Sequence, residues 1–236
     1  MNAMLQTASQ MMGDLSSAWR PAATDTEMEG SELAEAVIAR SFDIVSSIGL
    51  LLMLAPVFAV LCLAIWLHDG GSPFFVHWRI GRGGVPFPCL KLRTMVVDSE
   101  RRLEALLESD PEAAREWALD QKLRDDPRIT SLGVFLRKSS LDELPQLFNV
   151  LIGQMSMVGP RPIVAAEMPR YGRYIRDYCR VRPGITGLWQ VSGRNLVSYR
   201  RRVAIDTLYA RNKSLSVDLF ILTRTIPAVV AARGAT

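Results

Sequence analysis

Two adjacent carboxylates, Asp142 and Glu143, lie in the segment SSLDELPQLFNVLIGQMSMVGPRP, residues 139–162. An ionised, positioned carboxylate can attack phosphorus and form an aspartyl phosphate. Basic side chains close to such a carboxylate can bind the oxygens of the phosphate. The residue types therefore allow a phosphoryl-transfer centre at this pair. The bases of the same region are Arg128, Arg137, Lys138 and Arg161.

The same segment also has the pattern of a helix start. Ser140 and Glu143 have the spacing of a capping box, and the apolar run LFNVLI follows them. On this interpretation the acids only stabilise the positive end of the helix dipole. A helix N-terminus also keeps a carboxylate ionised and offers N–H groups to a phosphate. The structural and the chemical interpretations are therefore compatible.

Two segments rich in glycine and proline carry the other candidate residues. In MVGPRP, Pro160 and Pro162 restrict the backbone on either side of Arg161, whose guanidinium suits bidentate phosphate binding. The irregular segment VRPGITGLWQVSGRN contains Arg194, and long loops often carry function. Lys91 could add a further charge. Each base alone is better explained as a solvated surface residue, and only their clustering near these loops favours phosphate binding.

The elements that position these residues begin with a long apolar segment. Residues 44–67 carry no charge, and as a helix they would extend about 36 Å, enough to cross a bilayer core. Pro56 near their middle predicts a kink or break. Bases flank the segment on both sides, so the positive-inside rule does not place the basic C-terminal body outside. We expect a helix that enters the membrane, bends at Pro56 and returns, although a simple span or a buried helix also fits the sequence.

The rest of the chain predicts a small, helix-rich body. Residues 70–95 alternate short apolar runs with Gly/Pro turns and predict strands, whereas 98–122 predict two amphipathic helices broken near Pro111. Residues 215–230 are apolar with few charges and fit either a membrane interface or a protein core. Helices are also expected at 143–152, 164–180 and 196–212.

The composition limits the possible partners. Residues 1–36 hold one base and six acids, and the remainder holds 27 bases and 18 acids. A basic body favours anionic partners, but its bases do not form a stripe with interleaved aromatics, so nucleic-acid binding is not expected. Three cysteines without CxxC spacing suit a reducing compartment. His68 and His77 lie far from the acid pair in sequence, so a metal site built on several imidazoles is not expected.

Taken together, the motifs resemble the bacterial sugar transferase family, the small monotopic phosphoglycosyl transferases. The resemblance runs from about Arg40 to the C-terminus and leaves residues 1–36 outside. It includes RSFDIVSS, FPCLKLRTM, DDPRITSLGVFLRKSSLDELPQLFNVLIGQMSMVGPRP, RPGITGLWQVSGRN and IDTLYARNKSLSVDLFIL. The ending TIPAVVAARGA and the length are most similar to undecaprenyl-phosphate galactose phosphotransferases that initiate exopolysaccharide synthesis. The family often has Ser-Pro at the helix break, where this chain has Ala55-Pro56.

The resemblance implies an enzyme of the bacterial inner membrane with its catalytic domain on the cytoplasmic face. It would move a hexose 1-phosphate, of galactose or glucose, from a UDP-sugar to undecaprenyl phosphate and release UMP. Asp142 would be the nucleophile and a ligand of Mg²⁺, and Glu143 would assist it. The phosphate-binding residues would be Lys91, Arg137, Arg161 and Arg194. The nucleotide-binding residues would be Pro160, Arg161 and Pro162.

We therefore expect an α-rich α+β fold. It would be a monotopic membrane protein with a Pro-broken re-entrant N-terminal helix, a small β element and several amphipathic helices around the active site. Its parts would be an acidic, flexible tail (1–36), the re-entrant helix (37–69) and a cytoplasmic catalytic domain (70–236). The expected partners are a UDP-sugar, undecaprenyl phosphate and membrane lipid, and a homo-oligomer is compatible with the sequence. The alternative is a non-catalytic membrane adaptor of a polysaccharide-assembly complex, which would not need Asp142.

Overall fold

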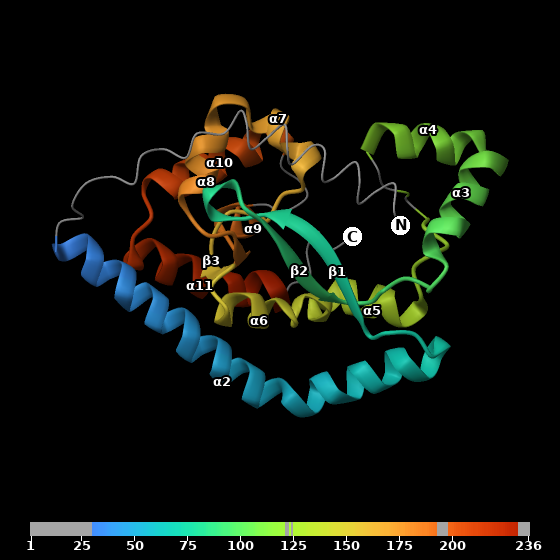
Figure 1. Cartoon of the computed structure of the whole chain (residues 1–236), viewed down its shortest axis with the longest axis horizontal. Helices are drawn as coiled ribbons and strands as arrows, with labels where there is room; N and C mark the ends of the chain where they lie inside the picture. The colour runs from blue at the N-terminus through green and yellow to red at the C-terminus, as the bar shows by residue number, and fades with distance from the viewer. Residues whose placement is uncertain (1–29, 121–122, 124, 193–197, 231–236) are drawn as a thin grey trace. The chain divides into compact units, whose positions relative to one another are not determined.

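The computed structural model describes residues 30–120, 123, 125–192 and 198–230. The chain divides into two units, residues 1–37 and 38–236, and among the described residues the strands and most of the helices lie in the second. Its predominance of helix over a small amount of sheet confirms the expected secondary-structure composition (Figure 1).

The elements follow one another along the chain as Figure 1 labels them. The α-helices are α2 (Gly30–Asp69), α3 (Ser99–Ser109), α4 (Pro111–Asp120), α5 (Ser131–Ser139), α6 (Gln146–Leu151), α7 (Met168–Tyr171), α8 (Ile175–Arg180), α9 (Leu188–Val191), α10 (Tyr199–Arg211) and α11 (Leu215–Val230). The strands are β1 (Phe74–Ile80), β2 (Pro86–Leu92), β3 (Ser156–Val158) and β4 (Gly184–Thr186). The 3-10 turns are η1 (Arg82–Gly84), η2 (Leu141–Glu143), η3 (Ala165–Glu167) and η4 (Gly172–Tyr174).

Helix α2 is the long apolar helix. It begins at Gly30, inside the segment assigned to the tail, and it continues without interruption through Pro56. Figure 1 shows α2 changing direction along its length, but re-entry into a membrane stays a prediction. The stretch Leu33–Asp69 is long and apolar enough to cross a membrane, and its most apolar 18 residues have a mean hydropathy of 2.8. Only 11% of these 18 residues are buried, which argues against a core helix.

The beginning of α2 within the larger unit is tied to the body by polar groups. Arg40 donates hydrogen bonds to the carbonyls of Val150 and Leu151, at 2.7 and 2.8 Å, which caps the C-terminal end of α6. The buried Asp43 carboxylate accepts from the Met157 N–H at 2.8 Å and from the Ser156 hydroxyl at 3.0 Å. The segment RSFDIVSS therefore fastens α2 to α6 and β3.

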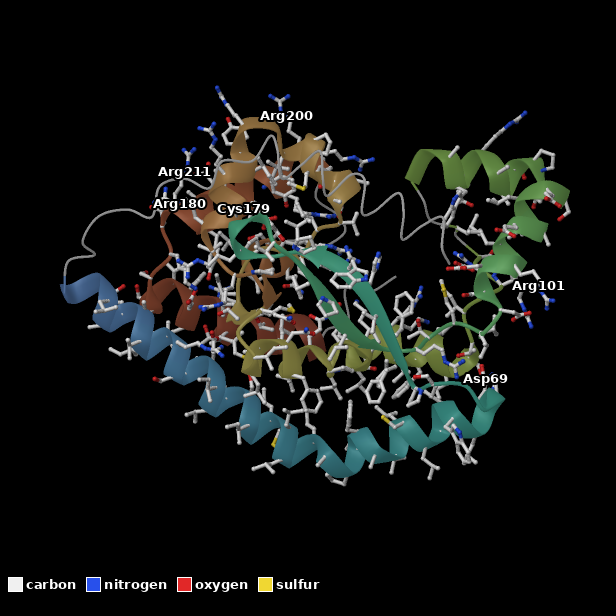
Figure 2. The ribbon with its side chains drawn as sticks, viewed as in Figure 1. Asp69, Arg101, Cys179, Arg180, Arg200 and Arg211 are labelled. Atoms are coloured by element: carbon white, nitrogen blue, oxygen red, sulfur yellow. The ribbon has the colours of Figure 1, made fainter. Side chains whose placement is uncertain are left out.

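The end of α2 contacts the same unit through apolar groups. Leu61 and Ile65 are buried in a cluster with residues of β2 and α5. Asp69, labelled in Figure 2, ends the helix and pairs with Arg93 after β2. Because both ends of the apolar stretch pack on one body, α2 lies along that body and does not project away from it.

The uncovered side of α2 is apolar. Apolar side chains of α2 that are more than half exposed include Val45, Leu52, Met53, Val60, Leu63, Trp66 and Leu67. Strand β1 exposes Phe74, Phe75, Val76 and Trp78, and α6 and its C-cap expose Phe148 and Ile152. Such large exposed patches mark contacts with membranes or other proteins.

The predicted strands of residues 70–95 form the antiparallel hairpin β1–β2, with Phe74 opposite Leu92 and Ile80 opposite Pro86. The second sheet is a short parallel pair of β3 and β4. The chain segments around Gly159 and Gly184 contact each other through backbone atoms, because neither glycine has a side chain. A Cβ at Gly184 would lie 2.0 Å from the Gly159 nitrogen. The segments MVGPRP and VRPGITG are therefore packed against each other.

The buried core joins the hairpin to α6, β3, α10 and α11. Its largest cluster includes Phe87, Cys89, Leu147, Val150, Met155, Tyr209 and Ile221. The hairpin is thereby held over α6, which directly follows the two carboxylates.

Several helix predictions need adjustment. The pair at 98–122 is confirmed as α3 and α4. The helix expected at 164–180 is instead divided into η3, α7, η4 and α8. Gly172, the first residue of η4, has a left-handed φ of 51° and separates α7 from η4. Helix α6 is shorter than expected, and α10 begins at Tyr199 after five residues outside the described part of the chain. Helix α11 buries Ile221 and exposes Phe220, so it has both a core face and an exposed apolar face.

Replacing Asp43 by alanine should destabilise the fold. The Ser156 hydroxyl and the Met157 N–H would lose a buried acceptor, and an unsatisfied buried donor costs about 1–3 kcal/mol. We expect a lower unfolding temperature of the detergent-solubilised protein in a thermal melt. Glu35→Ala removes an exposed carboxylate from the same helix and serves as the control. Equal unfolding temperatures for the two variants would contradict this role of Asp43.

Candidate active site

The two carboxylates lie on the turn η2, between α5 and α6. Ser140 precedes them as the C-cap of α5, with a left-handed φ of 58°, and its side chain makes no capping hydrogen bond. The predicted capping box is therefore wrong, because the chain ends one helix and turns before Pro145 opens the next. Left-handed non-glycine residues are strained and cluster at functional sites.

Lys91 on β2 bridges the two acids. Its Nζ atom lies 2.7 Å from Glu143 Oε1 and 3.6 Å from Asp142 Oδ2. The first distance is that of a charge-assisted hydrogen bond, whereas the second is an ion pair beyond hydrogen-bonding distance. Asp142 is only 9% exposed and Glu143 is partly exposed. Asp142 is thus the buried carboxylate whose oxygens are less committed to Lys91.

Burial and charge separate the acidities of the pair. Burial raises the pKa of Asp142, and Glu143 adds to this effect while Lys91 and Arg137 oppose it. Burial also acts to raise the pKa of Glu143, but Lys91 and Arg161 outweigh it and lower that pKa. The two pKa values are therefore shifted in opposite directions, and the neighbouring cations favour the ionised form of both carboxylates.

Lys91 is stabilised in its charged form by the same contacts. Burial acts to lower the pKa of Lys91, but the charges of Glu143 and Asp142 outweigh it and raise this pKa. The ammonium group therefore stays protonated at neutral pH, as a phosphate-binding cation must.

Arg137 on α5 is the second base at Asp142. Its Nε donates to the Thr94 hydroxyl at 2.9 Å, and its charge acts on the Asp142 carboxylate. Gly133 lets α5 approach this point, because a Cβ there would lie 2.0 Å from the Thr94 carbonyl oxygen. The structure thus places Lys91 and Arg137 where their charges act on Asp142, and their binding of phosphate stays a prediction.

The Pro160–Pro162 segment is held through its backbone. The Pro160 carbonyl accepts from the Gly184 N–H at 2.9 Å, and the Pro162 carbonyl accepts from Arg79 Nη1 at 3.1 Å. Arg161 between them acts electrostatically on Glu143. The segment is therefore rigid and adjoins the acid pair, on the side of Glu143.

Sequence reasoning missed the residues that support Arg161. Its guanidinium lies over the Trp189 ring at 5.6 Å from the centroid, and Arg202 lies over the same ring at 4.8 Å. Beneath them, the buried Asp206 accepts from the Tyr171 hydroxyl at 2.7 Å. Burial raises the pKa of Asp206 to about 7, against the effects of Tyr171, Arg202 and Arg161. These contacts join α7, α9 and α10, so local sequence patterns gave no signal of them.

Comparisons with known proteins agree with this geometry. The family model described as bacterial sugar transferase matches residues 34–232. The exopolysaccharide production protein ExoY of Sinorhizobium fredii is 51% identical over 195 residues, which cover 83% of this chain and 86% of that protein. The chain belongs to the bacterial sugar transferase family.

Two further relatives have names that specify substrates. Undecaprenyl-phosphate galactose phosphotransferase of Salmonella typhimurium is 50% identical over 198 residues, covering 84% of this chain and 41% of that protein. UDP-glucose:undecaprenyl-phosphate glucose-1-phosphate transferase of Caulobacter vibrioides is 39% identical over 204 residues, covering 83% of this chain and 71% of that protein. The chain thus spans less than half of the Salmonella sugar transferase and most of ExoY.

Among the residues that the structure describes in this sugar transferase, no three His, Cys, Asp or Glu side chains gather as a metal site. Asp142 and Glu143 nevertheless both reach the Lys91 ammonium group, so their oxygens lie close together. Mg²⁺ is commonly bound by one or two carboxylates together with substrate phosphates. The pair fits such an ion in the company of a diphosphate. Arg194 lies outside the described residues.

In this sugar transferase, Lys91→Met should move the acidic limb of the pH–rate profile to higher pH. Lys91 lowers the pKa of both carboxylates, so its loss raises both values and the acids bind protons at higher pH. The limb is measured as kcat/KM for sugar transfer across acidic pH. Lys138→Met, at an exposed position of α5, should leave the limb unchanged. An unshifted limb in Lys91→Met would show that Lys91 does not control these acids.

Proposed function

We propose that the chain is a phosphoglycosyl transferase, which moves a hexose 1-phosphate from a UDP-sugar to undecaprenyl phosphate and releases UMP. The observation that carries this proposal is the buried Asp142 carboxylate, weakly paired with Lys91 and close to Arg137. The names of the Salmonella and Caulobacter relatives support the lipid acceptor and a galactose or glucose donor. Such transfer would initiate the repeat unit of an exopolysaccharide.

In the first step, an Asp142 carboxylate oxygen attacks the phosphorus that bears the sugar. A bond forms between this oxygen and phosphorus, and the phosphoanhydride bond breaks. Its electron pair leaves on the phosphate oxygen of UMP, and the sugar phosphate remains on Asp142. Lys91 and Arg137 beside Asp142 stabilise the charge that develops on the transferred phosphate. Arg161 and its flanking prolines hold the nucleotide.

In the second step, a phosphate oxygen of undecaprenyl phosphate attacks the same phosphorus. The bond to Asp142 breaks, and its electron pair returns to the carboxylate. The product is an undecaprenyl diphosphate carrying the sugar. Glu143, kept ionised by Lys91 and Arg161, accepts a hydrogen bond or a proton from the acceptor phosphate. Asp142, with Glu143 beside it, would hold Mg²⁺, which would neutralise the charge of the diphosphate.

The packing of α2 supports a monotopic arrangement at the cytoplasmic face of the inner membrane. Arg40 near its start and Ile65 near its end both contact the catalytic body. A helix that crosses the bilayer would place these two ends on opposite sides of the hydrocarbon core, about 30 Å apart. Both ends could then not contact a body that lies on one side. A helix that dips into one leaflet keeps both contacts and buries the exposed apolar side chains in lipid.

Some of the basic side chains of the catalytic body lie far from the middle of α2. Arg180, Arg200 and Arg211, on α8 and α10, lie on the side away from the middle of α2 (Figure 2). In this proposal the exposed apolar side chains contact the lipid, and these three arginines do not lie beside the middle of α2.

Asp142→Asn should abolish turnover, because an amide cannot form the covalent intermediate. We expect UMP release from UDP-galactose or UDP-glucose, with Mg²⁺ and undecaprenyl phosphate, to fall at least about 1,000-fold. Sugar-phosphate label retained on the protein should disappear. Asp98→Asn, which changes an aspartate at the start of α3, is the control. A non-catalytic adaptor would tolerate Asp142→Asn, and release of UDP by the wild type would indicate a glycosyltransferase.

Reporter tags fused at residue 1 and at residue 236 should both be cytoplasmic. A re-entrant α2 returns the chain to the side from which it entered, whereas a single span separates the two ends. The positions are measured with paired reporters active on only one side of the membrane. A periplasmic signal from the N-terminal tag would contradict the re-entrant arrangement.

A further inference from the structure

His77 is a titratable residue of the hairpin that the proposed reaction leaves without a role. In the strand register, His77 is opposite Cys89 and Phe75 is opposite Lys91. Residues directly opposite each other in an antiparallel pair share one face of the sheet, and diagonal neighbours lie roughly 7–8 Å apart. His77 therefore lies on the same face as Lys91, one diagonal step along the sheet from the residue whose ammonium group contacts both acids.

The hydrogen bond from Arg79 fixes the tautomer of this imidazole. Arg79 Nη2 lies 3.1 Å from His77 Nδ1, and a guanidinium can only donate. Nδ1 must accept, so the proton of the neutral ring is on Nε2. The other terminal nitrogen of Arg79 donates to the Pro162 carbonyl at 3.1 Å. One guanidinium thus links His77 to the nucleotide-binding segment proposed above.

The surroundings keep the imidazole uncharged. The His77 residue is exposed, but partial desolvation by the hairpin and the charges of Arg79, Lys91 and Arg161 lower its pKa to about 4, and Glu167 opposes them only in part. Glu167 lies 3.9 Å from Arg79, which offsets its charge. At neutral pH, His77 is therefore a neutral donor among cations. Within the described part of the chain, Nε2 has no hydrogen-bond partner.

We propose that His77 Nε2–H donates a hydrogen bond to a phosphate oxygen of the nucleotide diphosphate bound between Lys91 and Arg161. The two cations on this side of the site attract anionic oxygens, so phosphate is the substrate group that fits beside them. The neutral imidazole adds a directed hydrogen bond without a further positive charge that would retain the anionic product. This inference rests on the proposed function and assigns a binding residue to it.

The test measures binding of UDP to the purified full-length chain by titration calorimetry, without any turnover. His77→Phe removes the donor and should weaken UDP binding about tenfold or more, as expected for a hydrogen bond to a charged group. His77→Gln keeps a neutral N–H donor and should retain most of the affinity. His68→Phe changes the other histidine, which lies in the last turn of α2, and this variant should bind UDP as the wild type does. Thermal melts of all variants verify folding.

Uridine, which lacks phosphates, identifies the group that His77 binds. Its affinity, measured by competition, should be the same for the wild type and for His77→Phe. Unchanged UDP binding in His77→Phe overturns the inference, as does an equal loss of uridine and UDP affinity. A wild type that binds UDP and releases UMP while His77→Phe behaves identically leaves the proposed function standing and overturns only this inference. A wild type that binds no UDP overturns this inference, whereas the proposed function is decided separately by UMP release.

Discussion

The site depends on one ammonium group shared by two adjacent carboxylates. Neighbouring acids repel each other when both are ionised, and burial adds to the cost unless a cation compensates. Lys91 supplies that cation from another part of the chain, so β2 must lie beside the turn η2. Asn149 on α6 secures this placement, because its side chain accepts from the Leu90 N–H at 3.0 Å and donates to the Pro88 carbonyl at 2.7 Å. The helix that follows the acids therefore holds the strand that balances their charge.

A second constraint follows from the proposed function, in which a soluble anionic nucleotide and a membrane lipid must reach one phosphate-binding centre. The hairpin serves both needs, since one of its faces carries Lys91 and His77 while β1 also exposes aromatic side chains such as Trp78. Helix α2 contacts the same body along its apolar stretch. The proposed membrane surface and the proposed nucleotide site are thus parts of one rigid framework, and neither depends on a flexible linker. This arrangement suits an acceptor phosphate that stays at the level of the lipid headgroups.

The sequence identified the candidate residues of the site better than their local geometry. The acid pair and Arg137 were found from residue type and clustering, Lys91 was assigned through the family resemblance, and the hairpin was found from its turns. The capping box failed because the Ser140 pattern is local, whereas the turn is imposed by how α5 packs. The contacts of Trp189 could not be predicted, since they join segments that are separate in sequence and share no periodicity. The sequence also offered no indication of a role for His77, because it lies far from the acids along the chain. Strand pairing makes it a diagonal neighbour of Lys91.

In the proposed reaction, the unequal environments of the two acids favour Asp142 as the nucleophile. Glu143 is hydrogen-bonded to Lys91 at 2.7 Å and its pKa is lowered, so its oxygens are committed and less basic than those of an ordinary glutamate. Asp142 lies 3.6 Å from the same nitrogen and its pKa is raised, so its oxygens are less engaged and more basic than those of an ordinary aspartate. Burial would also limit the access of water to a phosphosugar attached there. The features that favour Asp142 as the proposed nucleophile would therefore also protect the proposed intermediate until the lipid phosphate arrives.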